Sequence, residues 1–304
     1  MKRILVAGLI NIETTLKVEG FPIPYFPVTY PFFGVKTTVS GVGYNLAKAF
    51  TVLGNQVDFC SLIGPKKEPN AQFSHQALQQ DNISTDFIQH TLQETPQSVI
   101  LYDPQGKREI YVDLKDIQEQ TYPTNAFENA LQESDLCCLC NINFTRNHLQ
   151  LAKAAGVPIA TDVHVLSDPY DDYNADYMRA ADILFLSDEH LPDTPERFVR
   201  RLYDIYHNRI IVLGMGKKGA LLYEGRNNEM ALVSSVETRP IVNTIGAGDA
   251  LFSGFCHAWL HSGNPLLALR KAVVFASYKI GEATAAAGFL TDAALEEWCK
   301  KAYD

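Results

Sequence analysis

The sequence predicts an α/β fold in which a central, mostly parallel sheet is flanked by helices. Short runs of apolar and β-branched residues alternate with longer segments of helical periodicity along most of the chain. This alternation is typical of parallel strands joined by crossover helices. The chain has 304 residues, 46% of them hydrophobic, so it can bury a core of the size that such a sheet needs.

The expected elements follow from these runs in chain order. Strands are expected at 4–8, 57–63, 135–140, 159–163, 183–186 and 210–213. Helices are expected where apolar residues recur with the helical period, at 43–53, 71–81, 146–155, 195–207, 250–261, 266–282 and 292–302. No internal repeat is visible, and a single domain is expected over residues 1–304.

Two segments interrupt the alternation. Residues 14–39 hold four prolines among six aromatic side chains between Phe21 and Phe33, too proline-rich for a helix and too aromatic for a solvated linker. Residues 97–115 contain a β-hairpin pattern around Asp103-Pro104-Gln105-Gly106. Together they predict a small β lid inserted in the α/β body, which covers a ligand or a partner subunit. Two irregular surface insertions are the alternative.

Composition narrows the class of partner. A net charge of -9 and a pI near 5.4 argue against nucleic acid or an anionic membrane as partners and leave small molecules. No apolar run reaches the roughly 20 residues that span a bilayer, and the N-terminal residues lead directly into a strand-like segment, so a cytoplasmic location is expected. Cys137, Cys138 and Cys140 have poor spacing for a metal and are expected to be buried thiols.

The segment Val242-Asn243-Thr244-Ile245-Gly246-Ala247-Gly248-Asp249-Ala250 is the most informative. Gly246, Ala247 and Gly248 carry almost no side chain, so their backbone N–H groups can converge on an anion at the start of a helix. Asp249 stands beside that position. A carboxylate there can accept the proton of a hydroxyl while the helix N-terminus stabilises a transferred phosphoryl group. An ordinary strand-to-helix turn is the alternative.

A second glycine cluster, Ser40-Gly41-Val42-Gly43-Tyr44-Asn45, also precedes a helix. A polyhydroxyl ligand can approach the backbone at Gly41 and Gly43, and Asn45 offers a donor and an acceptor to a sugar hydroxyl. A helix start with glycines for tight packing is the alternative. Asn11 and Glu13 follow the first strand, at the edge where parallel sheets bind ligands.

Taken in order, these segments resemble the ribokinase-like, or PfkB, family of carbohydrate and nucleoside kinases over essentially the whole chain. Residues 41–45 are similar to the family's N-terminal glycine signature, and residues 243–249 to its C-terminal signature, Asp-Thr-x-Gly-Ala-Gly-Asp. The resemblance implies that Asp249 is the catalytic base, that residues 246–249 form an anion hole, and that Asn11 and Glu13 hold sugar hydroxyls.

The resemblance also implies ATP and Mg²⁺ as cofactors. It places the nucleotide near the loop 214–219 and near one helix, with the candidate residues Gly214, Gly216, Gly219, Thr244, Gly246, Gly248, Ala272, Phe275 and Ala276. In many relatives the lids of two subunits clasp one another, so a homodimer through the lid is expected.

Three departures from the family pattern stand out. Asn243 replaces the first aspartate of the C-terminal signature, a position that helps to bind a monovalent cation in relatives, so potassium activation is in doubt. Ser187 and His190 replace the first and last residues of the family's Asn-x-x-Glu motif. Asp188 or Glu189 is then the candidate to bind magnesium through waters. Ser40 replaces the first glycine of the N-terminal signature.

Two further groups have open interpretations. Asp162 and His164 end a predicted central strand, where His164 either contacts substrate or has a structural role. Lys217 and Lys218 either attract nucleotide phosphates or belong to a solvated turn.

The leading hypothesis is an ATP-dependent kinase that phosphorylates a hydroxymethyl group of a sugar. A nucleoside kinase such as a pseudouridine kinase is the first alternative, because a ribose-bearing substrate is compatible with the same residues. A sugar- or nucleoside-binding protein that has lost catalysis is the second. An NAD-dependent dehydrogenase is weaker still, because the first strand is not followed by a Gly-x-Gly-x-x-Gly turn.

Overall fold

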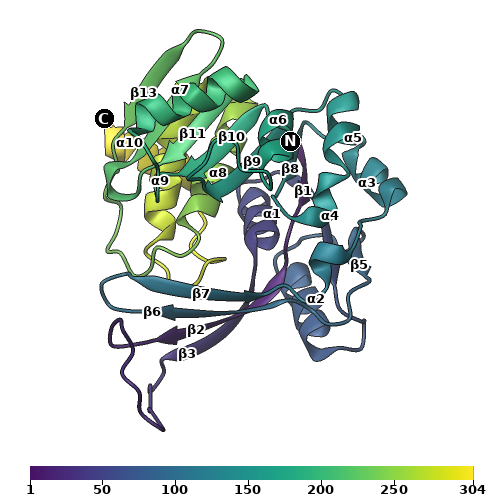
Figure 1. The fold of residues 1–304 in the computed structure, drawn as a ribbon, viewed down its shortest axis with the longest axis vertical. Coiled ribbons are helices and arrows are strands. Elements are labelled where there is room, and N and C mark those ends of the chain that lie inside the picture. The colour runs from purple at the N-terminus through teal and green to yellow at the C-terminus, as the bar shows by residue number, and fades with distance from the viewer. Residues whose placement is uncertain (304) are drawn as a thin grey trace.

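The larger sheet of the computed structural model, which describes residues 1–303, has the strand order β13-β12-β11-β10-β9-β8-β1-β4-β5 (Figure 1). Neighbouring strands from β11 to β5 are parallel, whereas β12 and β13 are antiparallel at one edge. The mostly parallel sheet expected from the sequence is confirmed. Its strands are β1 (Arg3–Ala7), β4 (Gln56–Ile63), β5 (Ile88–His90), β8 (Leu136–Leu139), β9 (Ile159–Val165), β10 (Ile183–Ser187), β11 (Ile210–Gly214), β12 (Ala220–Glu224) and β13 (Glu229–Val233).

Helices flank this sheet, as expected, and α8 is the one that positions the site. It packs between α1 and α9. The rings of Phe252 and Phe255 in α8 also lie 4.7 and 5.5 Å from the ring of Phe185 in β10, which fixes the helix against the sheet. The helices are α1 (Val42–Val52), α2 (Pro69–Gln80), α3 (Thr124–Leu131), α4 (Asn143–Arg146), α5 (Leu149–Ala154), α6 (Ala175–Ala180), α7 (Pro195–Tyr206), α8 (Ala247–Ser262), α9 (Pro265–Lys279) and α10 (Asp292–Tyr303).

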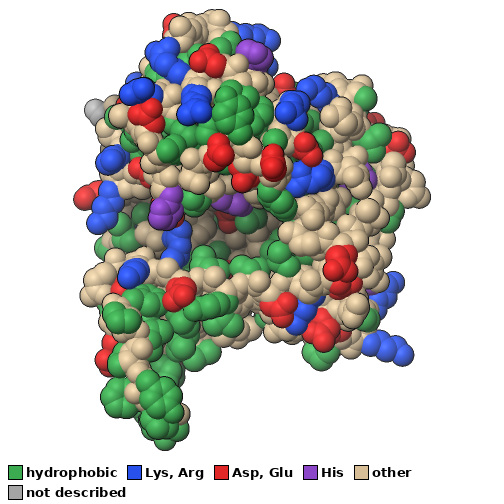
Figure 2. Space-filling view, viewed as in Figure 1, with side chains coloured by type: hydrophobic (Ala, Val, Ile, Leu, Met, Phe, Trp, Pro, Cys, Tyr) green, Lys and Arg blue, Asp and Glu red, His purple; other side chains and the backbone are tan. Residues whose placement is uncertain are grey.

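A smaller four-stranded sheet, in the order β3-β2-β6-β7, lies beside the body at the bottom of Figure 1. It comprises β2 (Asn11–Lys17), β3 (Val35–Ser40), β6 (Gln97–Tyr102) and β7 (Arg108–Asp113). The expected hairpin is present, with Val99 opposite Tyr111. The connection between β2 and β3 carries the aromatic cluster, and Figure 2 shows hydrophobic side chains gathered on the projection at lower left.

Some expected elements differ in the structure. The helix expected at 146–155 is present as α5 but starts later, because α4 ends at Arg146 and residues 147 and 148 form a turn between the two helices. The buried His148 side chain anchors the break, bonding the carbonyl of Tyr122 at 3.0 Å and stacking on Phe127. The helix expected at 266–282 ends at Lys279, because the next carbonyl, that of Ile280, accepts the backbone N–H groups of residues 242 and 243 instead.

Candidate active site

The candidate residues that follow strands meet at one edge of the larger sheet. Ser187 lies opposite Gly214 in the register of β10 and β11, and Phe185 lies opposite Asp162 in the register of β10 and β9. Because these strands are parallel, their carboxyl ends share an edge, which is where open α/β sheets bind ligands. Figure 2 shows the molecule hollowed between this body and the smaller sheet.

The N-terminus of α8 offers free backbone donors at this edge. Gly246 precedes the helix with a left-handed φ of 74°, and no side chain caps the helix. The first intrahelical bond runs from Ala250 N to the carbonyl of Gly246 at 3.0 Å. The N–H groups of Gly248 and Asp249 therefore lie in the unpaired first turn, and a helix of this length adds the positive end of its dipole. This arrangement suits a bound phosphate.

Asp249 is joined to the second glycine cluster through Asn45. The side-chain amide of Asn45 donates to Oδ2 of Asp249 at 2.7 Å, and its oxygen accepts from the Ser40 hydroxyl at 3.3 Å. Asn45 is only 3% exposed. The amide nitrogen and oxygen of Asn45 thus both form hydrogen bonds within the protein, and Asn45 holds the Asp249 carboxylate in position.

Close backbone packing sets the position of Asn45. A Cβ on Gly43 would lie 2.5 Å from the carbonyl carbon of Gly8, which directly follows β1. Only glycine lets α1 approach the end of β1 this closely. The tight-packing interpretation of Gly43 therefore has a structural basis in this contact.

Burial shapes the charges around Asp249. Burial raises the pKa of Asp249 above its ordinary value, against the opposing effects of the Asn45 hydrogen bond and of the His164 charge. Burial lowers the pKa of His164, but the nearby Asp162 carboxylate, 3.5 Å from its Nδ1, outweighs this and raises it to about 9. His164 is therefore a cation at neutral pH, beside the anion-binding turn.

Asn11 and Glu13 project from the same face of β2, because side chains two residues apart in a strand share a face. The Asn11 amide donates to the hydroxyl of Ser98 in β6 at 3.0 Å. The Asn11 Oδ1 and Glu13 Oε1 atoms are buried and accept no hydrogen bond within residues 1–303. Buried acceptors without a partner are costly, so the pair is well suited to hydroxyl donors of a ligand.

The structure adds two basic residues that the sequence analysis missed. Lys279, at the end of α9, is fully buried and its ammonium donates to the carbonyl of Ile245. Arg108, in β7, donates to the Thr244 hydroxyl at 3.1 Å. Lys279 could have been found from the sequence, because it lies on the same face of its helix as the apolar Ala272 and Phe275. No local sequence pattern indicates the contact of Arg108, because it joins β7 of the smaller sheet to the loop before α8.

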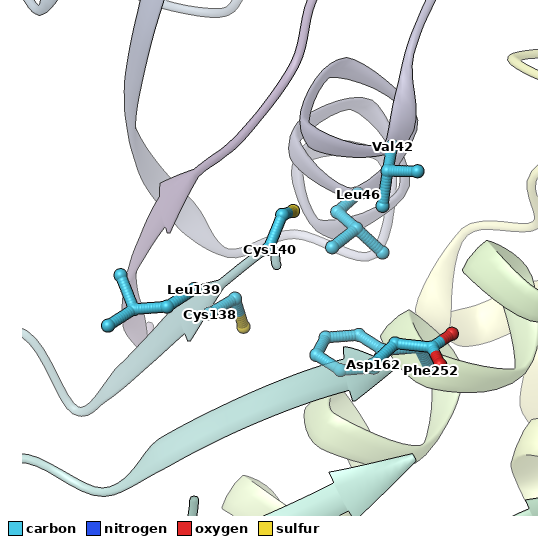
Figure 3. A pocket seen from close by; sticks show the side chains of 7 residues that line it. All are labelled: Val42, Leu46, Cys138, Leu139, Cys140, Asp162 and Phe252. Atoms are coloured by element: carbon cyan, nitrogen blue, oxygen red, sulfur yellow. The ribbon is translucent and has the colours of Figure 1, made fainter. Parts of the chain in front are cut away.

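A small cavity lies beneath the edge, between α1, β8, β9 and α8 (Figure 3). Its volume is about 10 Å³, room for one water at most. This cavity is therefore too small for a sugar or a nucleotide. The lining residues are Val42, Leu46, Cys138, Leu139, Cys140, Asp162 and Phe252. Cys137, Cys138 and Cys140 are buried free thiols, as expected.

The expected nucleotide residues divide into two groups. Gly214 and Gly216 lie at the ligand edge, with Gly219 closing the turn (Gly216–Lys218) that follows β11. Ala272 and Phe275 are fully buried and face Gly254 of α8, so their contacts are those of the core. Ala276 is half-buried. Lys217 and Lys218 are exposed on the turn.

The magnesium candidates lie beside the nucleotide candidates. The Asp188 backbone N–H donates to the carbonyl of Gly214 at 2.9 Å, and the Glu189 N–H donates to the Ser187 hydroxyl at 3.2 Å. Both residues thus lie in a turn at the ligand edge. Within residues 1–303 no cluster of three or more His, Cys, Asp or Glu is arranged to hold a metal.

The fold and the site together define a phosphoryl-transfer enzyme. Residues 1–292 match the pfkB family carbohydrate kinase domain, and the chain belongs to this family. It is therefore a carbohydrate or nucleoside kinase, and the resemblance inferred from its two glycine signatures is confirmed. No helix among residues 1–303 is long and apolar enough to cross a membrane.

Similar proteins cover the chain almost end to end. It is 24% identical over 295 residues to the acarbose 7(IV)-phosphotransferase of an Actinoplanes species, with 96% of each protein covered. It is 26% identical over 285 residues to the ATP-dependent ribose-1-phosphate kinase of Halopiger xanaduensis, with 90% of each covered. The structure of the microbiome-derived acarbose kinase Mak1 superposes with a TM-score of 0.88 at 22% identity, covering 98% of this chain and 99% of that one.

Proposed function

We propose that this enzyme transfers the γ-phosphoryl group of ATP to a hydroxymethyl group of a sugar, with Asp249 as the general base. The observation that supports the proposal most is the position of the Asp249 carboxylate at an uncapped helix N-terminus, from which its charge acts on the buried Glu13. Glu13 and Asn11 each have a buried oxygen without a partner. Anion-binding donors and a base at one point are what phosphoryl transfer to an alcohol needs.

The base acts through one carboxylate oxygen. Asn45 occupies Oδ2, which leaves Oδ1 to accept the proton of the incoming hydroxyl. Burial raises the pKa of Asp249, which strengthens its carboxylate as a proton acceptor. As the proton moves to Oδ1, the hydroxyl oxygen would bond to the γ-phosphorus while the bond from that phosphorus to its bridging oxygen breaks, so that ADP leaves. The N–H groups of Gly248 and Asp249 would stabilise the charge of the phosphoryl group, and Gly246 and Ala247 would shape the turn that presents them.

Asn11 and Glu13 hold the acceptor sugar in this proposal. Each presents one buried oxygen without a partner, so both favour ligand hydroxyl donors. Gly41 and Gly43 let the start of α1 pack closely on residues 8–10, which places Asn45 and Asp249 where we propose that the acceptor hydroxyl binds. The smaller sheet, which carries Asn11 and Glu13, then serves as the lid that excludes water from the transfer.

We assign ATP to the other side of the anion-binding turn, with Gly214, Gly216, Gly219 and the partly exposed Ala276 as its candidate contacts. Thr244 lies in the chain just before the turn. The carboxylates of Asp188 and Glu189 supply the oxygen chemistry that Mg²⁺ prefers, and we assign them to its waters. When bound, the ion neutralises charge on the β- and γ-phosphates.

A panel assay tests the proposal. ADP release is measured with ATP and Mg²⁺ against pentoses, hexoses, their phosphates, an oligosaccharide such as acarbose, and nucleosides including pseudouridine. We expect strong turnover with one sugar, and a nucleoside as sole acceptor would instead identify a nucleoside kinase. Ligand binding without ADP release by any acceptor would favour the binding-protein alternative and count against catalysis.

A pair of variants tests the acceptor site within the same assay. Glu13→Gln keeps the side-chain volume but presents an amide to the sugar, so we expect the sugar KM to rise while the ATP KM stays unchanged. Glu109→Gln is the matched control, because this exposed carboxylate of β7 bonds only the nearby Tyr111 hydroxyl. Equal effects of the two variants would remove Glu13 from the site.

A further inference from the structure

A buried ammonium lies under the anion-binding turn. Lys279 has no exposed surface, a rare state for lysine unless its charge is compensated. Its Nζ donates to the carbonyl of Ile245, the residue directly before Gly246. A positive charge is therefore fixed to the backbone at the point where the turn begins.

The charges that surround Lys279 come from four segments. Asp249 of α8, Glu13 of β2 and Glu282 after α9 act on it as negative charges, and Arg108 of β7 opposes them. The ammonium thus interacts electrostatically both with Asp249, the proposed base, and with Glu13, which we propose binds the sugar. Its position suits a counter-charge for both carboxylates.

The neighbouring Asn243 also donates to a backbone carbonyl. Its amide nitrogen donates to the carbonyl of Ala283 at 3.3 Å, and its oxygen accepts from the N–H of Ile245 at 2.8 Å. A bound monovalent cation needs such carbonyl oxygens, together with negative charge, as its ligands. In this protein the carbonyl of Ile245 accepts a hydrogen bond from Lys279, and the carbonyl of Ala283 accepts one from Asn243. The side chain of Asn243 carries no negative charge.

The residues present therefore do not fit a monovalent cation, and the same geometry supplies a substitute. We infer that the ammonium of Lys279, with the amide of Asn243, replaces a dissociable monovalent cation beneath the turn, and so holds residues 243–249 in the anion-binding conformation without potassium. Lys279 is then a positioning residue for phosphoryl transfer, and this part of the inference rests on the proposed function.

Two substitutions separate charge from packing. Lys279→Met keeps most of the side-chain length but removes the charge, and we expect kcat to fall about 100-fold with little change in either KM. Lys279→Ala leaves room for an ion, so KCl or NH₄Cl should restore its kcat in a saturable manner. Choline chloride keeps the ionic strength constant, and wild-type kcat should be the same in either salt.

A binding measurement keeps the inference testable if no sugar is accepted. The double variant Asn243→Asp, Lys279→Ala restores a carboxylate and frees the carbonyl of Ile245. We expect its thermal midpoint to rise with KCl relative to choline chloride, and that of the wild type to be the same in both salts. Lys271→Ala is the control, because that lysine of α9 pairs instead with Glu296 of α10.

Three results would overturn the inference, and the third of them can be measured without an acceptor sugar. They are a wild-type kcat that depends on potassium, full kcat in Lys279→Met without added cation, or a double variant whose thermal midpoint ignores potassium. If no acceptor in the panel supports ADP release, the proposed function is refuted. The effect of potassium on the thermal midpoint of the double variant then still tests the inference about Lys279.

Discussion

The side-chain amide of Asn45 donates a hydrogen bond of 2.7 Å to the carboxylate of Asp249. The bond joins the first turns of α1 and α8, two helices that are distant in the sequence and packed side by side. It leaves the second carboxylate oxygen of Asp249 free of the Asn45 amide. The two glycine signatures are thus parts of one arrangement.

A double-mutant cycle on Asn45 and Asp249 should show that the effect of Asn45 on kcat depends on the Asp249 carboxylate. Asp249→Asn removes the base and should lower kcat by about 10²–10⁴-fold, whereas Asn45→Ala should lower it less. The double variant should be no slower than Asp249→Asn, because orienting a carboxylate has no value once it is gone. Steady-state kinetics on the four proteins measures the coupling, and independent effects that multiply would refute it.

Asp249 should lower stability at neutral pH. Burial raises its folded pKa above the ordinary value of 3.8, so the folded state binds more protons than the unfolded state between those two values. Stability therefore falls as pH rises through that window. We expect Asp249→Asn to melt at or above the wild-type midpoint at pH 7, with the difference vanishing in acid. A variant that is less stable at pH 7 than at pH 4, relative to wild type, would contradict the sign.

Turnover should decline in alkali as Lys279 loses its proton. Burial lowers the pKa of Lys279 to about 8, although Asp249, Glu13 and Glu282 act to raise it, and Arg108 adds to the lowering. The Lys279 amine is protonated below this pH and deprotonated above it. We therefore expect kcat to be constant below this pH and to fall above it. In Lys279→Ala saturated with potassium this decline should move to higher pH. An identical decline in both proteins would assign it to another group.

The contact between Gly43 and Gly8 should be intolerant of a methyl group. Gly43→Ala places a carbon 2.5 Å from the Gly8 backbone, and neither backbone can move freely. We expect a loss of about 1–3 kcal/mol in the free energy of unfolding, measured by urea titration. Gly20→Ala is the control, since nothing lies within 4 Å of its added carbon. A stable Gly43→Ala protein would show that α1 can shift.

The loop between β2 and β3 should form a homodimer contact. Tyr25 and Phe32 are 89% and 86% exposed there, an unusual density of exposed aromatic surface. Sedimentation at micromolar concentration should give a dimer for the wild type and a monomer for Tyr25→Ser, Phe32→Ser. Tyr170→Ser, an exposed aromatic on the body, should leave the dimer intact. A monomeric wild type would refute the prediction.

The large sheet was predictable because its strands are local apolar runs. Six strands and most helices were expected near their observed positions, since periodicity and burial coincide in a parallel sheet. The edge hairpin β12–β13, the short β5 and the strand character of Asn11–Lys17 were missed. Their residues alternate weakly, and pairing partners far along the chain determine them.

The sequence by itself determined the family, the helix expected at 250–261 and the candidate roles of Asp249, Asn11 and Glu13, because small residues and carboxylates at fixed spacing define that chemistry. Only the tertiary structure decided that Asn45 serves Asp249, that Gly43 contacts Gly8, and that Lys279 lies under the turn. These relations join residues that are remote in sequence, and packing of α1, α8 and α9 brings them together. Periodicity along one chain carries no information about such distances.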